Sequence, residues 1–397
     1  MRKSIYSCIA ALAVVSGANA DVKVGNPMAM TGPIPDLVAP MALAVDLAEK
    51  HINEQGGMFA SGEEYVIVRA DSMCDPVASV DAVTKLINVS GVVGIVGPVC
   101  SGATIAQAES VAIPAGVVTL SVSASAPAIS NMETGTDLMF RTAASDAYQG
   151  VALAELALAK GITDISVSYA NDDYNAGLAE VFVEAYVANG GKIHLNEAHE
   201  PNKASYRSEV ATLGANTDNL ALFAYYGSGG ITLMRNAMET GAFSTFLGAD
   251  GMLAQEVIDQ LGAENLGQAT FTTSTSDEST HGYAMWKALA TVAGLNPLGP
   301  FVPNSYDATF MMALAVEHAG SADRDLIATS LRAIANAPGE IILPGEWAKA
   351  KKILAAGGDI HYNGGSGLQD FDANGDVAGD FSASVVQDGA WVGKIIK

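Results

Sequence analysis

Residues 94–110 read GIVGPVCSGATIAQAES and combine three features in one short stretch. The hydrophobic residues up to Val99 are typical of a buried strand, Cys100-Ser101-Gly102 ends that run, and a helix-like pattern follows. Two side chains that can act as nucleophiles therefore follow the carboxyl end of a strand, where α/β proteins place their functional groups. The stretch is compatible with a catalytic turn, or with a site that binds a molecule without changing it.

The same order of strand, small-residue turn, helix and glycine recurs along the chain. The run 91–99 leads to a helix pattern, to Gly116 and to a second strand at 117–123, and further copies begin at 164–170 and 219–226. This alternation predicts an α/β protein with parallel sheets built from βαβ units, and the near-continuous apolar strands predict sheets covered on both faces. A chain of 397 residues is expected to form two domains.

The N-terminus predicts export from the cytoplasm. Arg2 and Lys3 precede an apolar stretch, and Ala18-Asn19-Ala20 fits a cleavage site, so residues 1–20 are interpreted as a signal peptide cleaved after Ala20. Its removal leaves 18 Lys and Arg against 43 Asp and Glu. So acidic a surface repels nucleic acid and anionic membranes, but it does not identify a ligand.

Two cysteines remain after cleavage, Cys74 and Cys100. In an oxidising compartment an even pair favours a disulfide over two free thiols. Cys100 is then expected to be a structural cysteine and not a nucleophile.

Polar residues gather immediately after the predicted strands, at the edge where α/β sheets bind ligands. Hydroxyls and backbone N–H groups near helix starts suit a carboxylate, an acid suits an ammonium, and tyrosines offer flat surfaces with a polar end. Together they suit a zwitterion. The residues are Ser101, Ser121, Ser123, Ser125, Asn171, Asp172, Asp173, Tyr174, Tyr225, Tyr226 and Asp250.

Catalysis and metal binding have weaker support in the sequence. Ser101 lacks the leading glycine of a G-x-S-x-G nucleophile turn, and the sequence contains no HExxH, no Walker A motif and no convincing G-x-G-x-x-G after a strand. Residues 370–376, DFDANGD, match the first half of a calcium loop, but position 12 would be Phe381, so an Asn-Gly hairpin is favoured there. We expect no metal and no cofactor.

In order and spacing, these motifs resemble the periplasmic branched-chain amino acid (Leu/Ile/Val) binding proteins of ABC transporters, within the type I periplasmic binding protein superfamily. The likeness covers essentially the mature chain. The matching segments are GPIPD, INEQGG, DSMCDP, GPVCSGAT, SVSASAP, FRTAASDAYQG, NDDYNAG, YYGSGG, FLGADG and SYDAT.

The resemblance implies a role for each site residue. Ser101 would hold the ligand carboxylate with help from Ser125, while the Ser123 carbonyl, the Ser125 hydroxyl and Asp250 would hold the ammonium. Tyr174 and Tyr226 would close over the ligand from the second lobe, with Tyr225 as an alternative to Tyr226. The family also joins cysteines at the positions of Cys74 and Cys100. This chain has Leu37 where the family has an aromatic residue and Asp250 where its best-known members have Glu.

The resemblance also implies the architecture and the biological role. We expect two Rossmann-like lobes, 21–142 plus 276–380 and 143–275 plus 381–397, joined by a hinge with crossings near 142–145, 272–276 and 380. The protein would be a periplasmic, monomeric solute-binding protein and not an enzyme. It would close over an amino acid and deliver it to a membrane permease. Alternatives are a ligand sensor on the same fold or an exported serine hydrolase that uses Ser101. The sequence leaves the role of residues 340–368 open.

Overall fold

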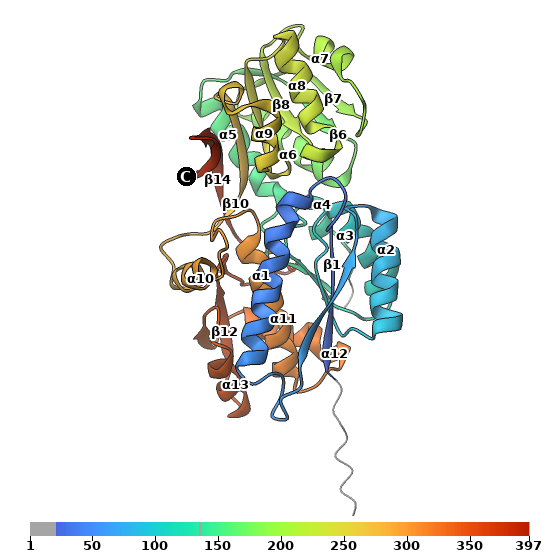
Figure 1. The fold of residues 1–397 in the computed structure, drawn as a ribbon, viewed down its shortest axis with the longest axis vertical. Coiled ribbons are helices and arrows are strands. Elements are labelled where there is room, and N and C mark those ends of the chain that lie inside the picture. Colours follow the sequence, from blue (N-terminus) through green and yellow to red (C-terminus); the bar gives the residue numbers. More distant parts are fainter. Residues whose placement is uncertain (1–20, 135–136, 397) are drawn as a thin grey trace, which may run out of the picture.

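The structure is a computed structural model that describes residues 21–134 and 137–396. The predicted signal peptide lies outside the described residues. Two separate β-sheets form the centres of two lobes arranged along the long axis of the molecule (Figure 1). The predicted fold class is confirmed: the molecule is an α/β protein with parallel-sheet cores.

Lobe 1 is built on a five-stranded parallel sheet with the order β2-β1-β3-β4-β5. Its strands are β1 (Val22–Met28), β2 (Tyr65–Asp71), β3 (Ile95–Val96), β4 (Thr119–Ser121) and β5 (Met139–Arg141). Its helices are α1 (Pro35–Glu54), α2 (Pro76–Lys85), α3 (Ser101–Gln107), α4 (Pro127–Ser130), α10 (His281–Val292), α11 (Val302–Ala319), α12 (Arg324–Ala335) and α13 (Trp347–Ala355). The helical turns η1 (Leu86–Ser90) and η2 (Ala108–Ala112) continue α2 and α3.

Helix α11 explains how the core of lobe 1 is assembled. All its residues from Val302 to Val316 are buried, because α11 lies between α1 and α12 and also contacts the sheet at β3 and β4. A helix that is buried on every side is typical of a core position. The chain returns to this lobe after β10, so the core joins segments from both ends of the sequence.

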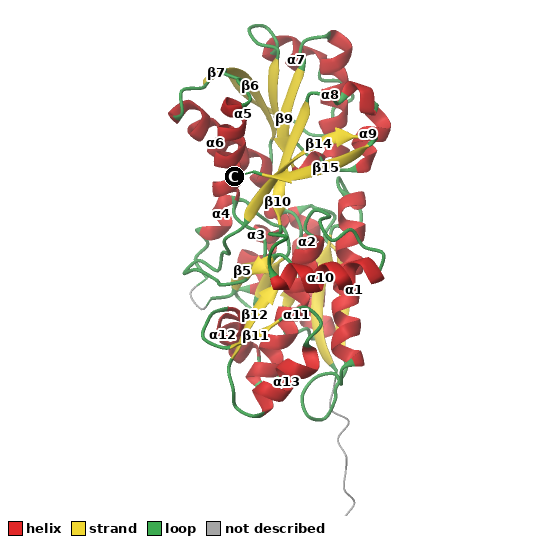
Figure 2. Cartoon of the chain, turned by 90° about the vertical axis from the view of Figure 1, so that its left-hand side faces the viewer, coloured by secondary structure: helices red, strands yellow, loops and turns green. Residues whose placement is uncertain are grey.

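Lobe 2 has a seven-stranded sheet with the order β15-β14-β10-β9-β8-β6-β7, which lies in the upper part of the molecule in Figure 2. Strand β14 pairs antiparallel with β10 and with β15, and the other pairs are parallel. The strands are β6 (Asp164–Ala170), β7 (Lys192–His199), β8 (Asn219–Phe223), β9 (Thr245–Ala249), β10 (Ala269–Thr275), β14 (Asp380–Gln387) and β15 (Ala390–Ile395). The helices are α5 (Asp146–Ala159), α6 (Asp173–Ala188), α7 (Arg207–Leu213), α8 (Gly230–Thr240) and α9 (Gln255–Leu261), with helical turns η3 (Tyr226–Ser228), η4 (Asp250–Met252) and η5 (Ala263–Asn265).

Local chemistry sets where the helices beside the sheets begin and end. The Asp172 carboxylate accepts a hydrogen bond from the Asn175 N–H at 3.0 Å and caps α6. At the other end of a helix, Gly241 takes the left-handed conformation that ends α8. The glycine that ends the helix was part of the repeating sequence pattern.

Some strands are shorter than predicted. The apolar run 91–99 forms only the two-residue strand β3, and 117–123 forms only β4. The flanking residues are nevertheless buried: Val99 and Val122, for example, lie in the core as loop residues. Burial, and not sheet pairing, therefore explains their apolar character.

Residues 340–368 form a small structure on lobe 1, which the sequence had left open. The strands β11 (Glu340–Ile342), β12 (Ile360–Gly364) and β13 (Gly367–Leu368) make a three-stranded sheet that contacts α10, α11, α12 and α13. The buried carboxylate of Asp307 on α11 accepts hydrogen bonds from the Tyr362 hydroxyl at 2.7 Å and the Gly365 N–H at 2.9 Å. The segment thus covers the helices of lobe 1.

The predicted Asn-Gly hairpin is wrong. The residues between β13 and β14 form a turn, but these two strands do not pair with each other. The Asp376 carboxylate makes a buried ion pair with Arg141, with Oδ1 at 2.6 Å from Nε, and it also accepts from the Ser130 hydroxyl at 2.7 Å. The turn is therefore a strap held to β5 and α4 by tertiary contacts.

Candidate functional site

A cavity lies where the carboxyl ends of strands from both sheets meet. Its free volume is small, about 30 Å³ against the roughly 300–1,000 Å³ of open small-molecule sites, so the two lobes lie close together around it. Its lining residues are Ile34, Leu37, Met41, Val99, Cys100, Ser101, Ser123, Tyr174, Tyr225, Asp250, Gly251 and Phe301.

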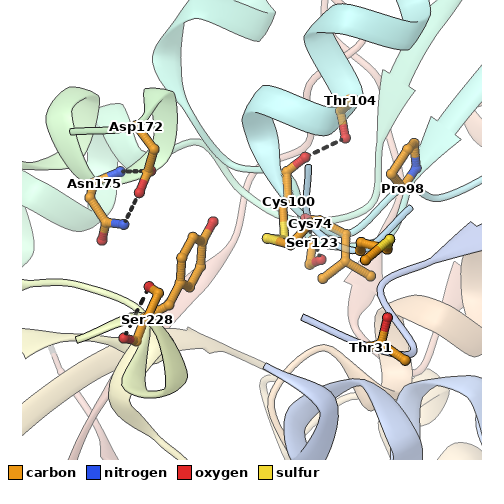
Figure 3. The surroundings of a disulfide bond; sticks show 12 residues. Thr31, Cys74, Pro98, Cys100, Thr104, Ser123, Asp172, Asn175 and Ser228 are labelled. Carbon is orange, nitrogen blue, oxygen red and sulfur yellow. Dashed lines mark hydrogen bonds between the residues drawn. A yellow bond between two sulfur atoms is a disulfide. The ribbon is translucent and has the colours of Figure 1, made fainter. Parts of the chain in front are cut away.

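The Cys74–Cys100 disulfide fixes one side of this cavity. It joins the loop after β2 to the start of α3, with the Cα atoms 5.3 Å apart, and it confirms the predicted pairing. Figure 3 shows Cys100 and Ser123 on one side of the space between the lobes and Asp172 on the other. Because Ser101 follows Cys100 directly, the disulfide also holds the first turn of α3 in place.

Two of the three predicted serines line the cavity, and their hydrogen bonds differ. The Ser101 hydroxyl oxygen accepts from the Ala126 N–H at 3.1 Å, which leaves its proton free to donate. The Ser123 hydroxyl donates to the Val99 carbonyl at 2.9 Å, which leaves its oxygen free to accept. Ser101 can therefore donate to an anionic group, and the Ser123 hydroxyl can accept from a cationic one.

The third predicted serine, Ser125, is buried beside the cavity and is absent from its lining. Its carbonyl accepts a hydrogen bond from the Asp146 N–H at 2.9 Å. Its contacts thus connect lobe 1 to the first residue of α5.

Asp250 lies in the lining, directly after β9, and is 7% exposed. Burial raises the pKa of its carboxyl, and a hydrogen bond from the Gln149 amide at 3.1 Å opposes that change. Within the described part of the chain, no Lys, Arg or His lies at ion-pair distance from Asp250. A buried carboxylate without a cation is costly, so this position favours a ligand that brings a positive charge.

Two tyrosines of lobe 2 form a wall of the cavity. The rings of Tyr174 and Tyr225 stack with centroids 5.4 Å apart and an interplanar angle of 21°. Burial, followed by the nearby Asp250 carboxylate, raises the pKa of Tyr174 well above its usual value, so the hydroxyl stays protonated.

Tyr226 takes a different place from its neighbour. It is absent from the lining, and its hydroxyl accepts a hydrogen bond from the Asp36 N–H of α1 at 3.0 Å. Next to it, the Gly227 N–H donates to the Pro33 carbonyl at 3.1 Å. Both bonds join lobe 2 to lobe 1 at the edge of the cavity.

The rest of the wall is apolar and was largely missed from the sequence. Leu37 was noted there, but Ile34, Met41, Val99 and Phe301 were not. Ile34 and Met41 flank Leu37 in the loop and first turns after β1. The rule that ligand-binding residues follow the carboxyl ends of strands could therefore have found them. Phe301 comes from the start of α11, where no strand precedes it.

The sequence also raised two alternatives, catalysis by Ser101 and metal binding. Among the described residues, no histidine lines the cavity beside Ser101. The described residues also contain no group of three or more His, Cys, Asp or Glu placed to hold a metal ion. In that same part of the chain, no helix combines the length and the apolar character needed to cross a bilayer.

Comparison with known proteins identifies the family. The family described as "Receptor family ligand binding region" matches residues 40–386. The Leu/Ile/Val-binding protein BraC3 of Rhizobium johnstonii is 29% identical over 327 residues, which cover 82% of this chain and 87% of that protein.

Solved structures share the fold. The leucine binding protein LivK from Thermotoga maritima superposes with a TM-score of 0.79 at 23% identity, covering 94% of this chain and 98% of that one. A solute-binding protein of an ABC transporter from R. palustris, in complex with benzoate, has a TM-score of 0.73 at 17% identity and covers 94% of this chain and 95% of its own.

The predicted resemblance is thus confirmed, and the family's ligand-binding character is consistent with a protein that is not an enzyme. This chain belongs to the receptor family ligand binding region, with the fold of the type I periplasmic binding proteins and with Leu/Ile/Val-binding proteins among its relatives.

Proposed function

We propose that this protein is a periplasmic solute-binding protein of an ABC importer that binds an amino acid with an apolar side chain between its lobes. The observation that carries the proposal is the buried Asp250 carboxylate, which faces the cavity and has no cationic partner among the residues that the structure describes. The Ser101 hydroxyl, free to donate, lies in the lining on the other lobe. An ammonium beside Asp250 and a carboxylate beside Ser101 describe the two ends of an amino acid head group.

The roles of the remaining polar residues follow from their free lone pairs and protons. The Ser123 hydroxyl and carbonyl can accept from the ammonium, since the hydroxyl proton is already bonded to Val99. The stacked pair of Tyr174 and Tyr225 would exclude water from the head group. Ser125 and Tyr226 would act from beside the cavity, Ser125 through the start of α5 and Tyr226 through its contact with α1.

The apolar wall sets the side-chain preference. Ile34, Leu37, Met41, Val99 and Phe301 offer no hydrogen-bond partner to a polar side chain. A charged or amide side chain buried there would lose its hydrogen bonds to water without replacement, at about 1–3 kcal/mol or more. The wall therefore favours aliphatic side chains.

Ligand binding would be coupled to closure of the lobes about the crossings near 142–145, 272–276 and 380. The closed arrangement makes two hydrogen bonds at the rim, from Asp36 to Tyr226 and from Gly227 to Pro33. A ligand that contacts Ser101 on one lobe and Asp250 on the other favours the same arrangement, because those contacts exist together only when the lobes are close. The closed protein, as a monomer, would then deliver its ligand to a membrane permease.

Calorimetric titration of the refolded mature protein tests the proposal. We expect L-leucine to bind and isocaproate, which is leucine without its ammonium group, to bind weakly. Asp250→Ala should weaken leucine binding by about 2–4 kcal/mol, because the ammonium would be buried without its partner. Asp259→Ala, at an exposed position on α9, is the matched control. Equal binding of leucine and isocaproate, or an unchanged affinity in Asp250→Ala, would contradict the proposal.

A further inference from the structure

We infer that Asp146 and Asp250 form an acid pair that accepts either a proton or the ammonium group of the ligand, so that ligand binding releases a proton. This inference rests on the proposed function and assigns a role to Asp146, a residue that the binding site described above does not use. Asp146 is absent from the cavity lining, so it is a positioning residue that acts on the ligand through Asp250.

Asp146 is a carboxyl group that the fold alone does not explain. It is the first residue of α5, at one crossing between the lobes, and it is fully buried at 0% exposure. Among residues 21–134 and 137–396, neither of its carboxyl oxygens finds a hydrogen-bond partner of ordinary geometry. A buried, ionised carboxylate without donors costs several kcal/mol, so this group is expected to hold a proton when no cation is near.

The groups around Asp146 come from every element packed against it. Asp250 from η4 disfavours its ionisation, while Arg141 from β5 favours it, as does the Ser125 hydroxyl. Burial, followed by Asp250, raises the pKa of Asp146 well above its usual value. Tyr174 from α6 and Tyr225 from the loop between β8 and η3 also face the two acids, and burial keeps both hydroxyls protonated.

Arg141 does not neutralise the pair. Its guanidinium donates to the Asp376 carboxylate at 2.6 Å from Nε, and its Nη1 donates to the Ala126 carbonyl at 3.1 Å. This cation is therefore already paired with the strap. The acid pair is left with no positive partner of its own in the described part of the chain.

The two carboxyls are unequal, which decides which one holds the proton. Asp250 accepts a hydrogen bond from the Gln149 amide at 3.1 Å, which stabilises its ionised form. Asp146 has the Ser125 hydroxyl nearby but accepts no hydrogen bond of ordinary geometry within the described part of the chain, so the shared proton resides on Asp146. An ammonium bound at Asp250 adds a positive charge near Asp146 and favours its ionisation. The ligand thus gains a second negative charge near its ammonium, and one proton leaves to solvent.

The linkage has a definite sign. Where the pair is protonated in the free protein, ligand and proton compete, so the affinity weakens as the pH falls, by up to about tenfold per pH unit for one proton released. Where the pair is already ionised, the affinity is independent of pH. Replacing Asp146 with Asn keeps the shape of the side chain but removes the proton that is exchanged.

Calorimetric titrations from about pH 5 to about pH 8 test the inference. The probe is L-leucine, titrated into the wild type, Asp146→Asn and the exposed-site control Asp259→Asn. We expect the affinity of the wild type and the control to weaken toward acid pH, and the affinity of Asp146→Asn to change much less. Titrations at one acid pH in two buffers of different ionisation enthalpy should show proton release for the wild type and the control, and not for Asp146→Asn. Each variant has the same ligand, so titration of the ligand itself cancels in the comparison.

Equal pH profiles for the wild type and Asp146→Asn, or an affinity that rises in acid, would overturn the inference. If Asp146→Asn does not fold, Ser125→Ala takes its place. Loss of that hydroxyl should move the acid weakening to higher pH, and an unmoved profile counts against the pair. Binding without pH dependence in the wild type contradicts the inference but leaves the proposed function intact, whereas absence of amino acid binding at every pH contradicts both.

Discussion

Removing the Cys74–Cys100 disulfide should destabilise the protein without removing a ligand contact. The change is the double substitution Cys74→Ser and Cys100→Ser, which avoids an unpaired thiol. The cross-link joins residues 26 positions apart. For a loop of that size, the chain-entropy treatment gives a loss of about 3.5 kcal/mol at room temperature.

Thermal unfolding measures this loss. An unfolding entropy of about 2.1 cal/mol/K per residue, summed over the mature chain, converts 3.5 kcal/mol into a Tm lower by about 4–5 °C. A reducing agent should lower the Tm of the wild type by a similar amount and leave the double variant unchanged. Because Ser101 follows Cys100 and begins α3, the variant's ligand affinity also shows whether the cross-link orders the carboxylate-binding side.

Two results would refute this reasoning. A wild type and a double variant that melt within about 1 °C of each other would show that the cross-link does not stabilise the protein by restricting its unfolded chain. A titration that finds two reactive thiols in the native wild type would show that the cross-link does not form.

Three further predictions concern lobe closure, the strap and the response to acid. A Cβ at Gly227 would lie 2.5 Å from the Pro33 carbonyl of the other lobe, whereas a Cβ at Gly267 meets nothing within 4 Å. Gly227→Ala should therefore weaken ligand binding by about 1–3 kcal/mol in calorimetry. Gly267→Ala is the control and should leave the affinity unchanged. Asp376→Ala leaves the buried Arg141 unpaired and should cost about 3–5 kcal/mol in urea unfolding, and a loss below about 1 kcal/mol would contradict that role. Burial lowers the pKa of His199 from 6.5 to about 4, so on acidification the unfolded chain takes up a proton at this residue before the folded protein does. The free energy of unfolding should therefore fall by about 3 kcal/mol as the pH decreases from 6.5 to about 4. His199→Gln should flatten that part of the stability profile, and an unchanged slope would exclude His199 as its cause.

The fold was readable from the sequence because buried parallel strands and their helices leave a strong repeating pattern. The pattern was less reliable at the strand ends. The run 91–99 is apolar because all but one of its residues are buried, yet only Ile95 and Val96 pair in the sheet. Hydrophobicity reports burial, and a buried loop beside a ligand cavity has the same composition as a buried strand.

The polar half of the cavity was predictable for a related reason. Ser101, Ser123, Tyr174 and Asp250 each follow a strand, and the carboxyl ends of strands from both sheets meet at one place. The same rule could not choose between the adjacent residues Tyr225 and Tyr226. Only the folded chain shows which of two neighbouring side chains faces the cavity.

Other features depend on contacts between distant parts of the chain. Phe301 reaches the cavity from the start of a helix, with a positive φ of 56° that the sequence does not announce. The Asn-Gly turn near Asp376 was expected to form a hairpin, but an ion pair with Arg141, 235 positions away, holds it as a strap. An Asn-Gly turn is compatible with both a hairpin and a strap. The ion pair between Asp376 and Arg141 determines which of the two forms.

A thermal-shift screen of the refolded mature protein tests the central claim most directly. The panel pairs each proteinogenic L-amino acid with its analogue lacking the ammonium group. A ligand at 100 times its Kd adds about 2.7 kcal/mol of stability, which corresponds to a rise of about 3 °C in Tm. We predict that aliphatic L-amino acids raise the Tm and that their deaminated analogues do not. A panel in which no amino acid shifts the Tm, or in which the analogues shift it as much, would contradict the assignment of Asp250 and Ser101 to an amino acid head group.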